Sequence, residues 1–266
     1  MARKKSSTNT KIKEGRGLGH GKGYKPFLRV GDVPSLGKSS RPKGWKTERT
    51  HQLLSSLELN YFYVLEWAPG VVDVREQFPL PLEETLEIAK RLGIKHSADN
   101  ATGESFIMTT DFLVDEVIDG KTILKARSIK PASELGSKRV LEKLEIERTY
   151  WADRGVDWGL VTDQDIPMAL SKNVEWVHDS LLPEVPEDLL CQIETALFAE
   201  LEERADMPLS KLALKVDRDL GMKPGLALSV VRHLIASRQW LVDMNQLILT
   251  DKPLSVTRNF SDIALA

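Results

Sequence analysis

The chain has 266 residues, 41% hydrophobic and 29% charged, which is enough to bury one large core or two modest ones and excludes global disorder. It contains no run of about 18 uncharged apolar residues and no apolar stretch after the basic N-terminus, so we expect no membrane contact and a cytoplasmic location. The single cysteine, Cys191, excludes an internal disulfide and a thiolate metal site, and its apolar helical surroundings predict a core position.

The formal net charge of −2 is distributed unevenly along the chain. Residues 1–50 carry +11 and the remaining residues carry −13. The basic stretch is rich in Gly, Ser, Pro and Thr and has almost no apolar periodicity before Phe27, so we expect an extended arm that contacts a polyanion. The candidate DNA contacts of this arm are Lys11, Lys13, Arg16, Lys22 and Lys25.

Glycine occupies every second position of this arm from Gly15 to Gly23. The spacing fits neither a dinucleotide-binding fingerprint nor a P-loop, which excludes those nucleotide cradles. Two interpretations remain open. One is a flexible basic ribbon along phosphates, in which glycine lets backbone amides approach oxygens closely, and the other is a solvated tail.

Residues 52–67 have helical periodicity, and Glu58 falls within the apolar half of the helix. A carboxylate there is costly unless it is paired, solvated in a cleft or bound to a cation. The alternative is a glutamate at the rim of the apolar face that reaches water. Residues 71–78 then alternate like a strand, and a second helix is expected over 83–92 with Gly93 at its end.

Two segments, 106–114 and 122–130, flank Asp119-Gly120, which is a favoured two-residue hairpin turn. Counting outward from this turn places Asp111 opposite Ser128, and Lys130 projects to the same face as Ser128. The pattern therefore predicts that Asp111, Ser128 and Lys130 cluster. An ordinary cross-strand ion pair between Asp111 and Lys130 is the simpler explanation of the same pattern.

A long helix is expected over 134–154, ended by Gly155. Glu147 falls on its apolar face, so a second acid is predicted to point inward, among Val140, Leu141, Leu144 and Trp151. A strand over 156–162 follows. This element order predicts an α/β domain over residues 1–165, with a mixed sheet flanked by helices.

Residues 166–266 are predicted to be mostly helical. Helices over 187–203, 208–220 and 224–237, followed by short strands over 240–242 and 247–249, give the outline of a winged-helix domain. Such domains usually bind DNA through their third helix. This domain carries a net charge of −5, which favours contact with a protein over contact with phosphate backbones.

An acid on a helix, an acid on a strand and a lysine on the adjoining strand form the layout of PD-(D/E)xK nucleases. Longer blocks resemble the TnsA-like endonucleases of cut-and-paste transposition. The blocks occur in the order expected for that family and comprise residues 13–17, 19–22, 53–59, 75–80, 110–115 and 141–145. The resemblance covers most of the first 165 residues and is weaker beyond them.

The resemblance implies a restriction-endonuclease-like domain, a winged-helix domain and a DNA endonuclease that cuts the non-transferred strand at the 5′ ends of a transposon. It also implies three partners, which are the double-stranded transposon ends, the DDE-type transposase TnsB and the AAA+ regulator TnsC. By position, Glu58, Asp111 and Lys130 match the catalytic acid, acid and lysine of the family. Ser128 departs from the glutamine that the family usually has there.

Hydrolysis of a phosphodiester at such a site requires a divalent ion with oxygen ligands, and we expect Mg²⁺, with Mn²⁺ as a substitute. Asp111 is the expected bridging ligand, Glu58 the ligand of a second ion, and the backbone carbonyl of Ile129 a further oxygen. Lys130 would stabilise charge on the phosphate or hold the attacking water.

Ser128 offers only a neutral hydroxyl, which reaches less far than a glutamine amide. Some restriction enzymes with serine at this position recruit an acid from the next helix, and Glu147 is the candidate here. Without such a substitute, metal affinity falls, and the enzyme is slow, dependent on its partners or inactive.

Two other functions remain open. A stand-alone restriction or repair nuclease would cut DNA without partners. A non-catalytic DNA-binding adaptor would dock the transposase and the regulator, with Ser128 as the mark of lost chemistry. A zinc-protease signature is absent, because none of the five histidines forms an i, i+4 pair.

Overall fold

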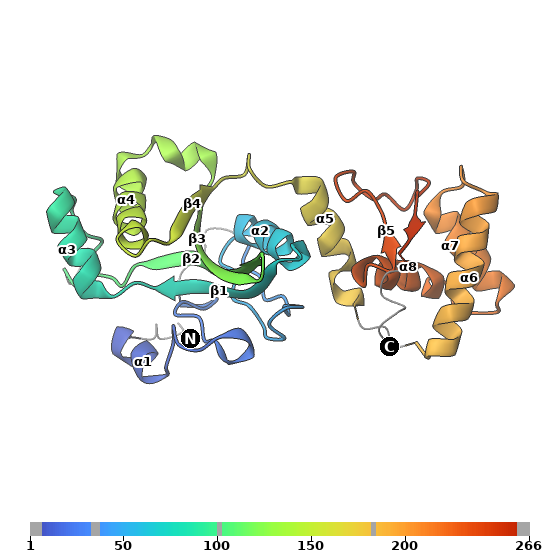
Figure 1. Ribbon diagram of the computed structural model, residues 1–266, viewed down its shortest axis with the longest axis horizontal. Helices are drawn as coiled ribbons and strands as arrows, with labels where there is room; N and C mark the ends of the chain where they lie inside the picture. The colour runs from blue at the N-terminus through green and yellow to red at the C-terminus, as the bar shows by residue number, and fades with distance from the viewer. Residues whose placement is uncertain (1–6, 33–37, 100–102, 182–184, 260–266) are drawn as a thin grey trace. The chain divides into compact units, whose positions relative to one another are not determined.

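The computed structural model describes residues 7–32, 38–99, 103–181 and 185–259 (Figure 1). The chain divides into two compact units, Met1–Ile166 and Pro167–Ala266, and the boundary expected from the sequence lies one residue away. Residues 1–6 and 33–37 of the predicted arm lie outside the described residues. Within the described ranges, no helix has the length and apolar character needed to cross a bilayer.

A four-stranded mixed sheet forms the centre of the N-terminal unit, in the order β1-β2-β3-β4 (Figure 1). β1 (Val71–Pro79), β2 (Thr109–Ile118) and β3 (Lys121–Ile129) are antiparallel neighbours, and β4 (Asp157–Val161) runs parallel to β3. A parallel neighbour needs a crossover connection, which the helix between β3 and β4 supplies. The predicted mixed α/β architecture is confirmed.

The hairpin of β2 and β3 has the register predicted from its turn. Asp119 and Gly120 both have positive φ, 51° and 75°, as the favoured hairpin turn requires. The ladder pairs Phe112 with Arg127 and continues without a register shift to the turn, which sets Asp111 opposite Ser128.

Three helices surround the sheet: α2 (Ser56–Trp67), α3 (Leu82–Leu92) and α4 (Lys138–Ala152). Leu113 and Ala126 of the sheet share one buried cluster with Trp151 of α4, and α3 contributes to the same cluster. Phe112 points to the opposite face, because neighbouring strand residues alternate, and its ring contacts that of Tyr61 on α2. Helices therefore cover both faces of the sheet.

Two helices begin later than their sequence patterns predict. α2 starts after Ser55, whose hydroxyl accepts a hydrogen bond from the amide of Glu58 and caps the helix. α4 starts after a 3₁₀ turn at Ala132–Gly136. The prediction that Leu141 faces the core is wrong, because the side of α4 that packs on the sheet runs through Leu144, and Leu141 is 48% exposed.

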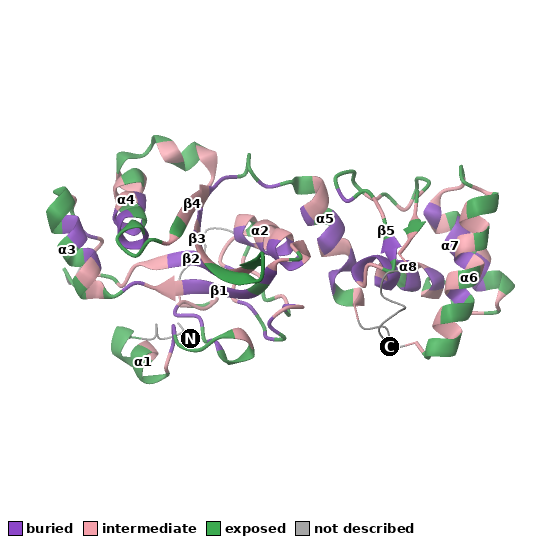
Figure 2. Ribbon diagram, in the orientation of Figure 1, coloured by how far each residue is buried: buried purple, intermediate pink, exposed green. Residues whose placement is uncertain are grey.

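The described part of the basic N-terminal segment folds onto β1, so the prediction of an extended arm is wrong for these residues. The segment contains α1 (Thr8–Lys13) and a 3₁₀ turn at Gly21–Gly23. Tyr24 and Phe27 are both 3% exposed, and burial of their rings fixes the segment on the domain. By contrast, α1 has no buried residue (Figure 2).

The alternating glycines serve this packing. Gly17 and Gly19 have positive φ, 85° and 94°, which glycine adopts without strain. A Cβ at Gly17 would lie 2.2 Å from the Cγ of Pro79, and a Cβ at Gly19 would lie 2.7 Å from the carbonyl oxygen of Gly23. The glycines of residues 15–23 therefore build a compact loop, the glycine loop. Neither the flexible ribbon nor the solvated tail considered from the sequence describes it.

β1 is the first strand in the sheet order, and the N-terminal residues cover its unpaired edge. Three backbone carbonyls of β1 accept hydrogen bonds from this part of the chain. The donor and acceptor pairs are Arg49 and Val74 at 2.7 Å, Tyr24 and Glu76 at 3.1 Å, and Phe27 and Gln77 at 3.2 Å.

A buried ion network anchors residues 49–52 to β1. The fully buried carboxylate of Glu76 lies 2.8 Å from Nη1 of Arg49, 2.8 Å from Nδ1 of His51 and 2.9 Å from the amide of Gln52. Burial alone raises the pKa of Glu76, but the hydrogen bonds and charges of Arg49 and His51 outweigh it and lower the pKa to about 2. Glu76 is therefore a structural anion.

The C-terminal unit is mostly helical, as predicted. Its elements are α5 (Met168–Val177), a 3₁₀ turn (His178–Ser180), α6 (Glu187–Glu203), α7 (Leu209–Asp219), α8 (Leu226–Ala236), β5 (Trp240–Leu241) and β6 (Thr257–Arg258). Helices α6 to α8 followed by two short strands have the element order of a winged helix. The sequence pattern did not predict α5. Pro167 is a sign of the boundary between the two domains, although proline also suits the position just before a helix.

Two predictions for this unit are wrong. β5 pairs with β6 and not with residues 247–249. The side chain of Asn173 instead engages that stretch, since it donates to the carbonyls of Met244 and Gln246 and accepts from the amide of Ile248. Cys191 is exposed, because the buried side of α6 runs through Ile193 and Leu197, out of phase with it.

Candidate active site

Asp111 and Lys130 form the centre of the site. Oδ2 of Asp111 accepts hydrogen bonds from the backbone amide of Ile129 at 2.7 Å and from Nζ of Lys130 at 2.9 Å. Nζ of Lys130 also donates to the carbonyl of Ile129 at 2.8 Å. Asp111 is 8% exposed, so the hairpin register brings a buried carboxylate and a lysine together, as the turn predicts.

Glu58 lies in the first turn of α2 and is 7% exposed, so it does not sit at a solvated rim. Its carboxylate accepts hydrogen bonds from the amide of Leu54 at 2.9 Å and from the hydroxyl of Ser55 at 3.0 Å. The hydroxyl of Ser55 also caps the amide of Glu58, so Ser55 and Glu58 hold each other at the start of the helix. The helix start therefore fixes the orientation of this acid.

Glu147 of α4 is 4% exposed and points inward, as its place on the apolar face predicts. Its Oε2 accepts a hydrogen bond of 2.6 Å from the hydroxyl of Ser128, which is 1% exposed. Within the described residues, Oε1 of Glu147 has no hydrogen-bond partner. Ser128 therefore links the third acid to the strand that leads to Lys130.

Gln77 belongs to the same cluster, and the sequence analysis assigned it no role. It is 2% exposed, and its Nε2 lies 3.4 Å from Oε2 of Glu58 and 3.4 Å from Oδ1 of Asp111. One signal was available, because Arg75, Glu76 and Gln77 are three successive polar residues inside a strand whose other residues, apart from Asp73, are apolar. Such a run inside a buried strand indicates polar contacts that the strand alone does not explain.

The site has an excess of negative charge in a desolvated place. Burial, with the negative charge of Asp111, raises the pKa of Glu58 to about 7 and that of Glu147 to about 7. Burial lowers the pKa of Lys130, but the charge and hydrogen bond of Asp111 outweigh this effect and raise it. Lys130 is therefore a cation among three buried acids.

A cavity of about 490 Å³ opens beside these residues. Lys130 and Glu147 line it together with Thr109, and Phe106, which is 50% exposed, also forms part of its wall. The side chain of Lys130 is 32% exposed while its ammonium group contacts Asp111. A phosphate group can therefore approach Lys130 through this cavity.

The donor set fits a divalent cation. Carboxylates and a backbone carbonyl are the hard oxygen ligands that Mg²⁺ and Mn²⁺ prefer, and here they are provided by Glu58, Asp111, Glu147 and Ile129. The raised pKa values of two acids and the unpaired Oε1 of Glu147 are features that a bound cation would satisfy. The three carboxylates do not all lie within 4.8 Å of one another in the described structure.

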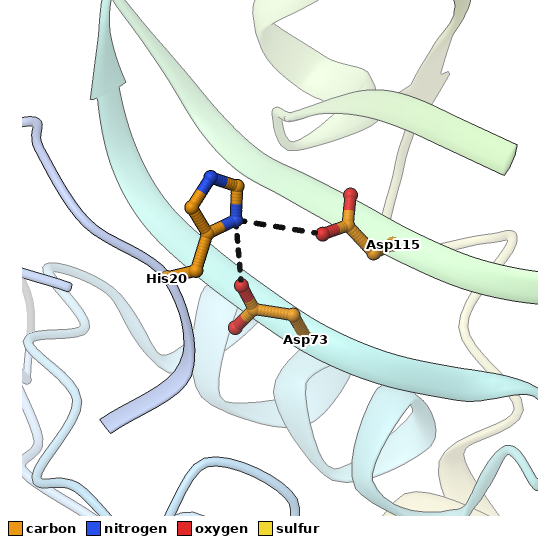
Figure 3. A group of neighbouring side chains, drawn as sticks. All are labelled: His20, Asp73 and Asp115. Carbon is orange, nitrogen blue, oxygen red and sulfur yellow. Dashed lines mark ion pairs between the residues drawn. The ribbon is translucent and has the colours of Figure 1, made fainter. Parts of the chain in front are cut away.

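A second cluster, formed by His20, Asp73 and Asp115, meets that distance criterion among the described residues (Figure 3). Nδ1 of His20 lies 3.6 Å from Asp73 and 3.8 Å from Asp115. Arg75 already contacts both acids, at 2.6 Å from Asp115 and 3.5 Å from Asp73, and the amide of Gly21 donates to Asp73. A guanidinium therefore occupies the place of a cation, and the cluster holds the glycine loop on β1 and β2.

The predicted DNA contacts differ in their surroundings. Lys13, Lys22 and Lys25 are exposed, and Lys11 is half-buried with its ammonium group over the ring of Phe27. Arg16 is instead 8% exposed, and its guanidinium pairs with Asp32 and Glu14. The prediction that Arg16 contacts DNA is therefore not supported, because its donors are used inside the domain.

Helix α8 would be the DNA-reading helix of a winged-helix domain, and most of it is buried in the C-terminal unit. Ser229 is its one exposed residue. The guanidinium of Arg232 donates to the carbonyl of Trp176 at 2.7 Å, and the ring of His233 lies 3.1 Å from the carbonyl of Ser180. The basic groups of α8 therefore serve the packing of the unit.

Comparisons with known proteins agree with this geometry. Residues 68–163 match the family described as TnsA-like endonuclease N terminal, and residues 165–244 match the family described as TnsA endonuclease C terminal. The chain is 43% identical over 227 residues to the Transposon Tn7 transposition protein TnsA of Escherichia coli, a match that covers 85% of this chain and 82% of that protein. The resemblance of the sequence blocks is confirmed, and the chain belongs to the TnsA family of endonucleases.

Proposed function

We propose that this chain cuts the non-transferred DNA strand at the 5′ ends of a transposon during cut-and-paste transposition, as a divalent-metal-dependent nuclease. The observation that carries the proposal is the ion pair of Asp111 and Lys130 beside two further buried acids, Glu58 and Glu147. Membership of the TnsA endonuclease family supports it.

In this proposal Asp111 and Glu58 are the principal metal ligands, and the carbonyl of Ile129 and the carboxylate of Glu147 supply further oxygens. The ion, Mg²⁺ or its substitute Mn²⁺, would polarise the phosphate and lower the pKa of a bound water. Lys130 stabilises negative charge that develops on the phosphate, because its ammonium group already faces the cavity. Ser128 orients Glu147, which supplies the oxygen that the family's usual glutamine would otherwise offer.

For DNA binding, we propose that Lys11, Lys13, Lys22 and Lys25 contact the phosphate backbone. Lys11 and Lys13 lie on α1, and Lys22 and Lys25 lie on or next to the loop that packs on β1, so a folded segment presents all four lysines. Fixed cations lose less conformational freedom on binding than cations on a disordered tail. The glycine loop thus serves DNA contact through its lysines and not through flexibility.

For partners, we propose that the chain acts in the cytoplasm with a DDE-type transposase similar to TnsB and an AAA+ regulator similar to TnsC. The C-terminal unit is the proposed docking surface for basic protein segments. The net charge of −5 over residues 166–266 and the burial of α8 support protein contact over DNA contact.

The decisive experiment is strand-resolved cleavage of a labelled transposon-end duplex by the full chain with its DDE partner and Mg²⁺. Asp111→Ala is expected to abolish the 5′-strand cut and to leave the 3′-strand cut of the partner intact. Asp119→Asn is the matched control, since it removes the charge of an exposed acid in the turn of the same hairpin and asparagine suits the positive φ there. Identical products from native and Asp111→Ala proteins would favour the adaptor, and robust cutting without any partner would favour a stand-alone nuclease.

A further inference from the structure

Gln77 has an unusual backbone conformation for its position. Among the described strand residues it is the one non-glycine residue with φ in the left-handed region, at 51°. The ladder pairs Glu76 with Phe112 and Phe78 with Thr110, so Gln77 lies opposite Asp111 in the register. Residues with side chains avoid this conformation unless the surrounding structure enforces it.

The surroundings do enforce it. The carbonyl of Gln77 accepts a hydrogen bond from the amide of Phe27 at 3.2 Å, which turns this peptide toward the N-terminal segment. On the preceding residue, Arg49 and His51 hold the buried carboxylate of Glu76. The strain is therefore maintained by contacts on both sides of the strained residue.

The side-chain amide of Gln77 lies between the two acids with a defined orientation. Its Oε1 accepts a hydrogen bond of 3.0 Å from the hydroxyl of Thr109, so its NH₂ group faces the other way. That NH₂ group lies 3.4 Å from an oxygen of Glu58 and 3.4 Å from an oxygen of Asp111. A flipped amide would direct its oxygen at both carboxylates, which is repulsive.

We infer that Gln77 is a positioning residue that sets the separation of the two metal-binding carboxylates before the ion arrives. The inference rests on the proposed nuclease function. Two buried carboxylates repel each other, and a neutral donor placed between them holds one oxygen of each without cancelling the charge that attracts a cation.

The second acidic cluster of the same sheet shows the contrast. Asp73 and Asp115 also face each other across β1 and β2, and there the group between them is the guanidinium of Arg75. A fixed positive charge neutralises the pair and competes with a metal ion. The guanidinium of Arg75 therefore bridges the pair on the sheet, whereas the group between Asp111 on β2 and Glu58 on α2 is the neutral amide of Gln77, and the recorded contact of Lys130 is with Asp111 alone.

The test measures Mn²⁺ affinity of the full chain by calorimetry, in the absence of DNA. Gln77→Gly removes the amide and also relieves the strained φ, which offsets part of the stability lost with the buried side chain. We expect its Mn²⁺ affinity to fall roughly 10- to 100-fold, the usual effect of removing a group that orients metal ligands. Asp119→Gly is the matched control, since it relieves a positive φ in the same sheet away from the acids and should leave the affinity unchanged.

A second variant separates the amide from the backbone. Gln77→Met keeps a side chain of similar length at the strained φ and removes the hydrogen bonds, and it should lose as much Mn²⁺ affinity as Gln77→Gly. In cleavage assays both variants should need more Mg²⁺ for half-maximal rate and recover at high Mg²⁺, which a merely structural role would not produce. Native Mn²⁺ affinity in Gln77→Gly would overturn the inference. Absence of Mn²⁺ binding by native protein, or its persistence in Asp111→Ala, would instead overturn the proposed metal site.

Discussion

The hydroxyl of Ser128 on β3 donates a 2.6 Å hydrogen bond to the carboxylate of Glu147 on α4, and both side chains are more than nine-tenths buried. Ser128 lies two residues before Lys130, so this contact fixes α4 relative to the strand that carries the lysine. A serine leaves space for the carboxylate, whereas a longer glutamine would extend into it. Serine in place of the family's usual glutamine is thus accompanied by the carboxylate of Glu147, which lies in the space that the longer side chain would fill.

Replacing Ser128 by alanine removes the 2.6 Å hydrogen bond from its hydroxyl to Oε2 of Glu147. We expect the free energy of unfolding to fall by about 1 to 3 kcal/mol, since a buried acceptor loses its donor. Urea unfolding at neutral pH measures the change. Ser133→Ala, at an exposed position, should change stability by less than about 0.5 kcal/mol. Equal stability of Ser128→Ala and the native protein would contradict the assigned contact.

Glu147→Gln should become more stable relative to the native protein as pH rises. The pKa of Glu147 in the folded protein, about 7, lies above its ordinary value of 4.5, so the folded state keeps a proton that the unfolded state releases. The contribution of Glu147 to stability therefore falls between these two pH values. Urea unfolding in EDTA, at pH values near 4.5 and near 7, measures the difference in free energy of unfolding between the variant and the native protein. A difference that does not change with pH would show that Glu147 titrates normally.

Glu76→Gln should destabilise the protein by about 3 to 5 kcal/mol at neutral pH, because it leaves the buried guanidinium of Arg49 without its counter-ion. The pKa of Glu76 is lowered to about 2, so its contribution is complete above its ordinary value of 4.5 and is lost as the pH falls to about 2. Native and variant stabilities should therefore converge in acid. Glu83→Gln, at an exposed position, is the control and should be neutral.

Replacing Lys11, Lys13, Lys22 and Lys25 by glutamine should weaken DNA binding and flatten its salt dependence. Each lysine that contacts a phosphate contributes about 0.9 to the slope of log affinity against log salt. Fluorescence anisotropy with a duplex at several salt concentrations gives this slope. Arg16→Gln should leave the slope unchanged and lower stability, since Arg16 is paired with Asp32. An unchanged slope in the fourfold variant would remove the loop from the DNA interface.

Local rules predict the parts of the fold that depend on local geometry. The Asp119-Gly120 turn sets the register, and through the register it brings Asp111 to Lys130. Gly93 caps α3 with positive φ, as its position in the sequence indicates, whereas α4 ends at Ala152, three residues before Gly155. Each of these features is decided by a few neighbouring residues, so a single sequence is sufficient to predict it.

Features that depend on distant contacts were missed or predicted wrongly. The glycine loop looks flexible until Pro79, more than fifty residues later, is seen to fill the space that a Cβ would need. Asn173 engages the backbone of Met244, Gln246 and Ile248, next to and within the stretch predicted as a strand, about seventy residues away. The place of Gln77 depends on three separate segments, the helix with Glu58, the strand with Asp111 and the loop with Phe27. Composition and periodicity contain no information on such pairings.

The loop that covers β1 has a consequence for how the chain can be shortened. β1 is an edge strand, and Tyr24 and Phe27 occupy backbone acceptors along it. A chain that starts at residue 38 would expose this edge as a template on which a second copy can add a strand. Such a truncation is expected to aggregate, so it would report on self-association and not on the loss of DNA contacts. Single substitutions of surface lysines are the way to study this segment.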